Sequence, residues 1–105
     1  MKEIKYGVLL DFYGELLTEK QQQALDLYYN EDYSLLEIGE HLNISRQGVF
    51  ECIKKGAEHL ESYEAVLHLY EKERQKESVV AKIQDLIKDC EESLQTKIRS
   101  LLDLL

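Results

Sequence analysis

Apolar residues recur at helical spacing along almost the whole chain and divide it into predicted helices. The first helix is expected over residues 2–16. Its predicted buried stripe follows four-residue steps and consists of Ile4, Val8, Phe12 and Leu16. A second helix is expected from about Glu19 to Tyr29. The polar run over residues 30–32 ends it, because short polar side chains compete for backbone hydrogen bonds.

Two capping boxes mark predicted helix starts. Thr18 and Gln21 stand three residues apart before the second helix, and Ser34 and Glu37 repeat this arrangement. In each box the hydroxyl accepts a backbone N–H while the longer side chain reaches back to the cap residue. The helix that follows Ser34 is short. Its predicted buried face consists of Leu35, Ile38 and Leu42.

A tight turn connects this short helix to a fourth one. Asn43 tolerates the left-handed conformation typical of helix C-caps, and Ser45 is suited to cap the next helix. Gly39 costs about 1 kcal/mol relative to alanine inside a helix, which indicates that a neighbouring segment approaches closely there. The fourth helix has a predicted buried ladder of Val49, Ile53, Ala57 and Leu60. The pattern predicts a helix-turn-helix over residues 34–55, with an ordinary helical hairpin as the alternative.

The C-terminal part has helical periodicity without glycine or proline. Its charged run over residues 71–77 is either a solvated helix face or a break near Ser78. The apolar stripe beyond that run is narrow enough to pack against one other helix. It consists of Val80, Ile83, Ile87, Cys90, Leu94, Ile98, Leu101 and Leu105.

The partner of this stripe lies either in the same chain or in a second copy. A hairpin folded back on the N-terminal domain is one interpretation. Because a small core gains much from association, we expect instead a homodimer through the C-terminal helices. The predicted domains are residues 1–61, which contain the helix-turn-helix, and residues 62–105, a C-terminal helical extension for helix packing or dimerisation.

Composition supports an all-α fold. The 105 residues include no proline and only five glycines, so they offer little turn chemistry for β-hairpins. The N-terminus lacks the apolar run of a signal peptide, and no stretch approaches the roughly 20 apolar residues of a membrane span. We therefore expect a cytoplasmic protein.

The motifs that carry catalysis or hold cofactors are missing from the sequence. Cys52 and Cys90 lack the spacing of a zinc or redox motif, and the three histidines are scattered. No glycine-rich phosphate loop and no nucleophile or metalloprotease motif occurs. We expect neither enzyme activity, nor a cofactor, nor a metal site.

The chain is acidic, with a formal net charge of −8. Residues 18–61, which include the predicted helix-turn-helix, contain four basic and nine acidic residues. Nucleic-acid binders usually carry a surplus of Lys and Arg that replaces counterions on phosphate. Long-range attraction to a duplex is therefore expected to be weak or repulsive.

From Leu17 to Leu60 the chain resembles region 4 of sigma factors. The matching features are Leu17-Thr18-Glu19-Lys20-Gln21, Tyr28-Tyr29, Ser34 to Leu42 and Ile44-Ser45-Arg46-Gln47. Nearly the whole chain is similar to the small bacterial YlxM-like helix-turn-helix proteins, through its terminal helices and through Ile53-Lys54-Lys55 and Glu61-Ser62-Tyr63-Glu64. That resemblance implies a regulatory or adaptor role in the signal recognition particle pathway, with the particle's protein or RNA as partner.

The candidate contact residues lie on the helix that starts at Ser45. If the motif reads double-stranded DNA, this helix enters the major groove. Arg46 then pairs with guanine or clamps a phosphate, and Gln47 pairs with adenine. Ser45, Lys54 and Lys55 contact backbone phosphates.

Two further residues of this helix do not favour DNA as the partner. Glu51 repels phosphate unless it accepts from a cytosine amino group, and Phe50 suits a thymine methyl group or a protein interface equally well. The leading hypothesis is a helix-turn-helix adaptor that binds a protein or a ribonucleoprotein. The alternative is a sequence-specific DNA-binding regulator, and a third interpretation is that the motif serves only as a structural core.

Overall fold

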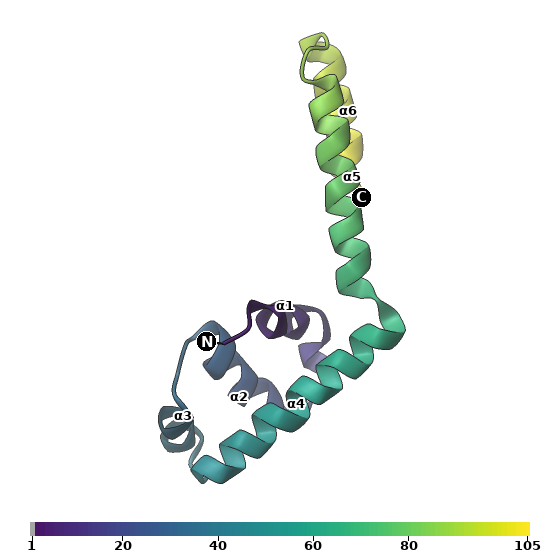
Figure 1. Ribbon diagram of the computed structural model, residues 1–105. Helices are drawn as coiled ribbons and strands as arrows, with labels where there is room; N and C mark the ends of the chain where they lie inside the picture. The colour runs from purple at the N-terminus through teal and green to yellow at the C-terminus, as the bar shows by residue number, and fades with distance from the viewer. Residues whose placement is uncertain (1) are drawn as a thin grey trace. The chain divides into compact units, whose positions relative to one another are not determined.

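The computed structural model describes residues 2–105, and all of its regular elements are helical, as the sequence predicts (Figure 1). The chain divides into two compact units, residues 1–70 and residues 71–105. Within residues 2–105, no helix is both long and apolar enough to cross a membrane. The α-helices are α1 (Ile4–Tyr13), α2 (Glu19–Leu25), α3 (Leu35–Leu42), α4 (Arg46–Leu67), α5 (Leu69–Ile87) and α6 (Glu92–Leu102), with a 3₁₀ turn η1 (Gly14–Leu16) and a π-helical turn η2 (Asp26–Asn30).

Both predicted capping boxes are present. The Gln21 N–H donates to Thr18 Oγ1 at 3.2 Å, and the Thr18 N–H donates to Gln21 Oε1 at 3.3 Å. At the start of α3, the Glu37 N–H donates to Ser34 Oγ at 3.1 Å and the Ser34 N–H donates to Glu37 Oε1 at 3.0 Å. The backbone hydrogen bond from Ser34 holds the pKa of Glu37 below its ordinary value. These bonds satisfy N–H groups that a helix start leaves without intrahelical partners.

The connection between α3 and α4 has the predicted geometry. Asn43 ends α3 in the left-handed conformation, with φ 57° and ψ 46°. Ser45 begins α4, and its Oγ accepts the Gly48 N–H at 2.9 Å. A Cβ atom at Gly39 would lie 2.9 Å from the Ile44 carbonyl oxygen, so only glycine fits where the turn passes α3. These features confirm the helix-turn-helix.

The core of residues 2–70 forms around α4, against which α1, α2 and α3 all pack. Val49, Ile53 and Leu60 are buried as predicted, and Ala57 is half-buried. At Gly56 an added Cβ would lie 2.6 Å from Leu25 Cδ1, so this glycine permits the close packing of α2 on α4. Buried residues from α1 to α4 form the core cluster: Leu9, Leu10, Tyr13, Leu17, Ala24, Leu25, Ile38, Val49, Ile53 and Leu60.

The predicted buried stripe of the first helix is wrong. Ile4 is 86% exposed and Leu16 is 57% exposed, whereas Leu9, Leu10 and Tyr13 are buried. The helix itself is shorter than predicted, because residues 14–16 form the 3₁₀ turn η1. Nearly every residue of α1 is apolar, so its composition leaves open which face turns inward, and contacts with α4 decide it.

The C-terminal unit is a helical hairpin (Figure 1). α5 continues without a break through Ser78, so the charged run over residues 71–77 is a solvated helix segment. α6 then packs against α5 of the same chain. The Gln95 amide donates to the carbonyl oxygens of Ile87, Lys88 and Cys90 at 2.7–2.9 Å and thereby closes the turn. Cys90 is exposed in this turn, so the predicted single stripe is divided between two helices.

Candidate interaction surface on the helix-turn-helix

One side of α4 faces away from the core and carries most of the predicted contact residues. We call this side the recognition face and define it as Arg46, Gln47, Phe50, Glu51 and Lys54. These positions lie within about 140° of one another around the helix, on an arc that adjoins the arc of the core positions of α4. Glu51 is half-buried and the other four are exposed. Lys55 is also exposed, and its helical position lies at the edge of this face.

A concavity of mixed polar and apolar character borders the recognition face. It has a volume of about 530 Å³ and is lined by Leu35, Arg46, Gln47 and Phe50. Phe50 is 47% exposed, and Leu36, which directly follows Leu35 on α3, is 61% exposed. The structure therefore brings the exposed Phe50 ring and Leu35 of α3 together with two of the predicted polar residues, Arg46 and Gln47.

Sequence reasoning missed part of this surface. Leu35 was expected on the buried face of α3, where it does pack against the core, but it also lines the concavity. Leu36 was not singled out. The available signal was a second leucine directly after the first, because adjacent helix positions point about 100° apart and cannot both face the core.

Two polar groups at the start of α4 already have partners. Ser45 Oγ accepts the Gly48 N–H, so its primary role is to cap the helix. Gln47 Nε2 donates to Glu51 Oε1 at 3.2 Å, one turn further along α4. A ligand that used the Gln47 amide or the Glu51 carboxylate would have to replace this bond.

Residues further along α4 fix this helix against α1. Glu61 Oε1 accepts from both Lys5 Nζ and Tyr6 Oη at 2.8 Å. The hydrogen bond from Lys5 is the main cause that holds the pKa of Glu61 below its ordinary value, and the same bond raises the pKa of Lys5. Glu61 therefore links α1 to the C-terminal half of α4.

Another carboxylate joins α1 to the end of α4 and the beginning of α5. Tyr13 Oη donates to Glu64 Oε1 at 2.6 Å, and the same Glu64 oxygen accepts the Tyr70 N–H at 3.0 Å. Burial is the main cause that raises the pKa of Tyr13, and the bond to Glu64 adds to it. The Glu61-Ser62-Tyr63-Glu64 segment thus supplies carboxylates that hold helices together.

Acidic groups surround a further hollow in the same unit. It has a volume of about 450 Å³, lies between α1 and α2, and is lined mainly by acidic and amide side chains. Its lining consists of Leu10, Asp11, Glu15, Gln22, Gln23, Asp26 and Asn30. Residues 1–70 as a whole contain six basic and 13 acidic residues. Among residues 2–105, however, no three His, Cys, Asp or Glu side chains are placed to hold a metal ion.

Comparison with known proteins connects this architecture to a family. The family model described as "Putative helix-turn-helix protein, YlxM / p13 like" matches residues 1–101. A UPF0122 protein of Clostridium kluyveri is 44% identical over 103 residues, which cover 94% of this chain and 93% of the relative. A UPF0122 protein of Oceanobacillus iheyensis is 46% identical over 88 residues, or 84% of each chain. One from Lactococcus lactis is 51% identical over 69 residues, or 66% of this chain and 62% of the relative.

Proposed function

Because this chain belongs to the family of YlxM/p13-like helix-turn-helix proteins, we propose that it is a cytoplasmic adaptor of the signal recognition particle pathway. It binds the particle's protein, alone or together with its RNA, and catalyses no reaction. The observation that carries this proposal is the half-exposed Phe50 ring, which lines a concavity together with Leu35, in a unit where acidic residues outnumber basic ones two to one.

The apolar part of the surface favours a protein partner. Exposed aromatic residues that border a concavity are typical centres of protein interfaces, because they bury a large area at a small cost in conformational entropy. Phe50 supplies the ring, and Leu35 extends the apolar area onto α3. Arg46 and Gln47 then form the polar rim that fixes the orientation of the partner.

The charge of the unit favours a basic partner. Its excess of seven carboxylates repels a bare nucleic-acid backbone and attracts a basic protein surface. Such attraction mainly accelerates association, and salt screens it. The complex should therefore weaken as the salt concentration rises, through a lower association rate.

A binding titration tests the proposal. The labelled chain is titrated with purified protein subunit of the signal recognition particle, with and without its RNA, at low and high salt. Saturable binding to the protein that weakens with salt is the expected result. Binding only when RNA is present would place the contact on the ribonucleoprotein, and no binding in either mixture would refute the adaptor role.

One observation favours a second function, sequence-specific binding of double-stranded DNA. Arg46 and Gln47 are exposed on the first turn of α4, the part of a recognition helix that contacts base edges. The resemblance to region 4 of sigma factors supports this alternative, in which Lys54 and Lys55 contact phosphates.

Selection from random DNA duplexes tests this alternative and should yield a preferred sequence. The preference should disappear in the double variant Arg46→Ala, Gln47→Ala, whereas Phe12→Ala on α1 should retain it.

We further propose that the two parts of the chain have separate roles. Residues 1–61 carry the binding surface, and the helices of residues 62–105 serve for packing and hold two copies together as a homodimer. The exposed leucines of the C-terminal hairpin support this second role.

A further inference from the structure

The C-terminal hairpin lacks a core of its own. Among residues 71–105 only Ile87 is buried, and the other apolar side chains are half-buried or exposed. Two helices of this length in water are marginal when so little apolar surface is covered, because the ordering of their backbone remains unfavourable. The stability of the hairpin therefore depends on something that covers its exposed apolar side chains.

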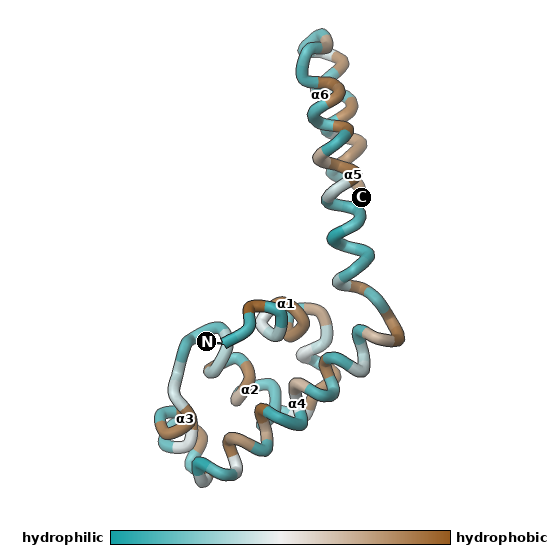
Figure 2. The backbone as a smooth tube through the Cα atoms, viewed as in Figure 1, coloured by the Kyte–Doolittle hydropathy of each residue, from teal (hydrophilic) through white to brown (hydrophobic). Residues whose placement is uncertain are grey.

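Each helix of the hairpin carries an inner and an outer apolar stripe. The inner stripe lies between the two helices and consists of Val80, Ile83 and Ile87 on α5 and Ile98 and Leu102 on α6. The outer stripe consists of Val79 and Leu86 on α5 and Leu94 and Leu101 on α6. These four residues are 52%, 79%, 46% and 64% exposed, and we call them the outer apolar face. In Figure 2 hydrophobic segments recur along both helices, whereas α5 is hydrophilic over residues 71–77.

Both outer stripes lie on the same broad side of the hairpin. Val79, Leu86 and Leu101 directly precede the inner residues Val80, Ile87 and Leu102, and Leu94 directly precedes the half-buried Gln95. Successive side chains of an α-helix point about 100° apart. On both helices the outer stripe therefore lies about 100° from the inner stripe, in the same rotational direction. Two antiparallel helices are related by a two-fold axis perpendicular to their plane. This axis maps each broad side of the hairpin onto itself. Equal displacements on the two helices therefore place both outer stripes on the same broad side.

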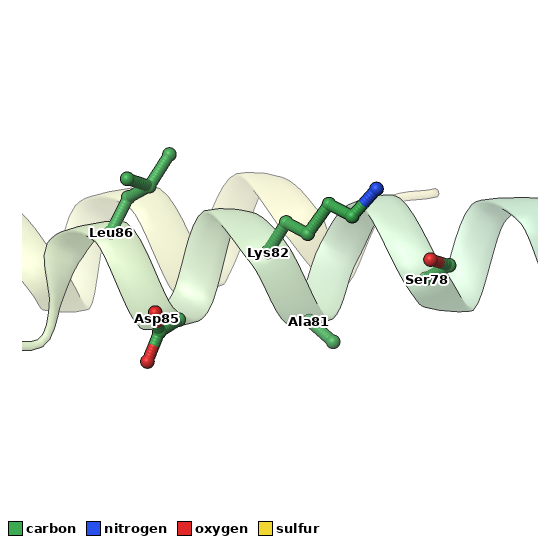
Figure 3. Close-up of a pocket in the computed structure, with 5 residues that line it drawn as sticks. All are labelled: Ser78, Ala81, Lys82, Asp85 and Leu86. Atoms are coloured by element: carbon green, nitrogen blue, oxygen red, sulfur yellow. The ribbon is translucent and has the colours of Figure 1, made fainter.

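Outside the outer apolar face the hairpin surface is mostly polar, apart from the exposed Leu104 and Leu105 at its C-terminus. A shallow hollow of about 510 Å³ lies along α5 and is lined by Ser78, Ala81, Lys82, Asp85 and Leu86. Figure 3 shows that the side chains of Lys82 and Leu86 point away from those of Ala81 and Asp85. The polar groups of this hollow do not converge on one point, so it has no features of a small-molecule site. A helical partner on the outer apolar face accounts better for the exposed leucines.

The distribution of charge permits a second copy as that partner. Residues 1–70 carry a net charge of −7, since they contain six basic and 13 acidic residues. Residues 71–105 carry a net charge of only −1, with seven basic and eight acidic residues. Two copies that meet through their hairpins therefore avoid most of the repulsion that an acidic chain exerts on itself.

The charge along the hairpin also selects an orientation. Residues 84–96, which form its turn end, contain one basic and four acidic residues. The remaining residues, 71–83 and 97–105, contain six basic and four acidic residues. Parallel copies would bring two acidic turn ends together. Antiparallel copies bring each acidic turn end beside the basic part of the other hairpin.

We propose that two copies of this chain pack their hairpins antiparallel through the outer apolar face and form a four-helix bundle. This inference rests on the proposed homodimer and adds its surface and its orientation. The interface is isologous, so Val79, Leu86, Leu94 and Leu101 of each copy contribute equally. The two turn ends, and with them the two Cys90 residues, lie at opposite ends of the bundle.

The surface is tested by measuring molar mass across a range of concentrations. The full chain should sediment as a dimer, and Leu86→Glu should sediment as a monomer. Because Leu86 is 79% exposed within the single chain, its replacement leaves the packing of α5 on α6 intact. Gln84→Glu on the polar side serves as the matched control and should remain dimeric. A dimer that persists in Leu86→Glu would overturn the surface, and a monomeric wild type would overturn the homodimer itself.

The orientation is tested by one distance. A spin label is attached to Cys90 in the Cys52→Ser variant, and the distance between the two labels of the dimer is measured. The middle of the outer apolar face on α5 lies between Val79 and Leu86, about 11 Å along the helix axis from Cys90, so an antiparallel bundle should give a distance of about 20–25 Å. A parallel bundle brings the labels within about 10–15 Å of each other. A single short distance would overturn the antiparallel arrangement while it left the dimer in place.

Discussion

The phenolic hydroxyl of Tyr13 donates a hydrogen bond to the Glu64 carboxylate at 2.6 Å and accepts the backbone N–H of Leu69 at 3.1 Å. Glu64 in turn accepts the Tyr70 N–H at 3.0 Å. Two N–H groups in the first turn of α5, which have no intrahelical acceptors, thus receive partners from α1 and α4. This contact joins three helices around one buried tyrosine.

Tyr13→Phe should destabilise the protein by about 1–3 kcal/mol. The change removes only the hydroxyl but leaves the Leu69 N–H without that acceptor and Glu64 without that donor. Chemical denaturation monitored by circular dichroism measures the loss. Tyr63→Phe is the control, because the Tyr63 hydroxyl makes only a long, exposed bond of 3.4 Å to the Leu16 carbonyl oxygen. A Tyr13→Phe variant as stable as the wild type would show that the junction around Tyr13 adds no stability.

Gly39→Ala should destabilise the helix-turn-helix even though alanine is the better helix former. The new Cβ would lie 2.9 Å from the Ile44 carbonyl oxygen, which is backbone and cannot turn away as a side chain can. Overpacking of this kind costs about 1–3 kcal/mol, which exceeds the gain of about 1 kcal/mol in helix propensity.

Thermal unfolding checks the prediction for Gly39. Glu40→Ala, at an exposed position of the same helix, should change the free energy of unfolding by less than about 0.5 kcal/mol. A Gly39→Ala variant as stable as this control would contradict the close approach of the turn to α3.

The link between Lys5, Tyr6 and Glu61 should make stability depend on pH. The pKa of Glu61 is lower in the folded chain than in the unfolded chain, mainly because of the hydrogen bond from Lys5. The stabilisation that ionised Glu61 provides is therefore fully present above the ordinary pKa of a glutamate. It disappears as the pH falls through the lowered pKa of Glu61 in the folded chain. Because Lys5 and Glu61 are about half exposed, this contribution is below about 1 kcal/mol at neutral pH.

Unfolding of the wild type and of Glu61→Gln at a series of pH values tests this link. The wild type should be the more stable of the two at neutral pH. The difference should shrink towards zero as the pH falls below 4. A difference that stays constant over this range would mean that the charge of Glu61 contributes nothing.

The sequence predicts the helix boundaries well wherever a local signal marks them. Thr18, Ser34 and Ser45 cap the helices that were expected to follow them, and Asn43 adopts the expected left-handed conformation. Each of these interactions joins residues no more than five positions apart. Side-chain chemistry and spacing are therefore sufficient to identify them.

The orientation of α1 and the C-terminal hairpin depend on distant contacts. α1 is apolar on most sides, and its buried face is set by Tyr6 and Tyr13, whose hydroxyls meet Glu61 and Glu64 more than 50 positions away. The turn between α5 and α6 has no glycine or proline, and the side chain of Gln95 closes it. Neither contact has a short-range sequence signature.

The candidate surface was identified from the sequence only in part. The predicted residues Arg46, Gln47 and Phe50 border a common concavity, because they follow one another at helical spacing after a recognisable cap. The positions of Leu35 and Leu36 relative to this concavity depend on how α3 packs beside α4, which the local pattern does not specify. Their roles in binding, and those of Ser45, Glu51, Lys54 and Lys55, are proposals that mutagenesis tests.

The most direct test compares two phenylalanines. Binding of the signal recognition particle protein is titrated with Phe50→Ala and with Phe12→Ala, which removes a ring of similar exposure from α1. If the recognition face contacts the partner, Phe50→Ala should weaken binding at least about tenfold, as expected for the central aromatic residue of an interface. Phe12→Ala should change binding less than about twofold, and both variants should keep the wild-type circular dichroism spectrum. Binding that is unchanged by Phe50→Ala, or weakened equally by both substitutions, would contradict the assignment of α4 as the partner-binding surface.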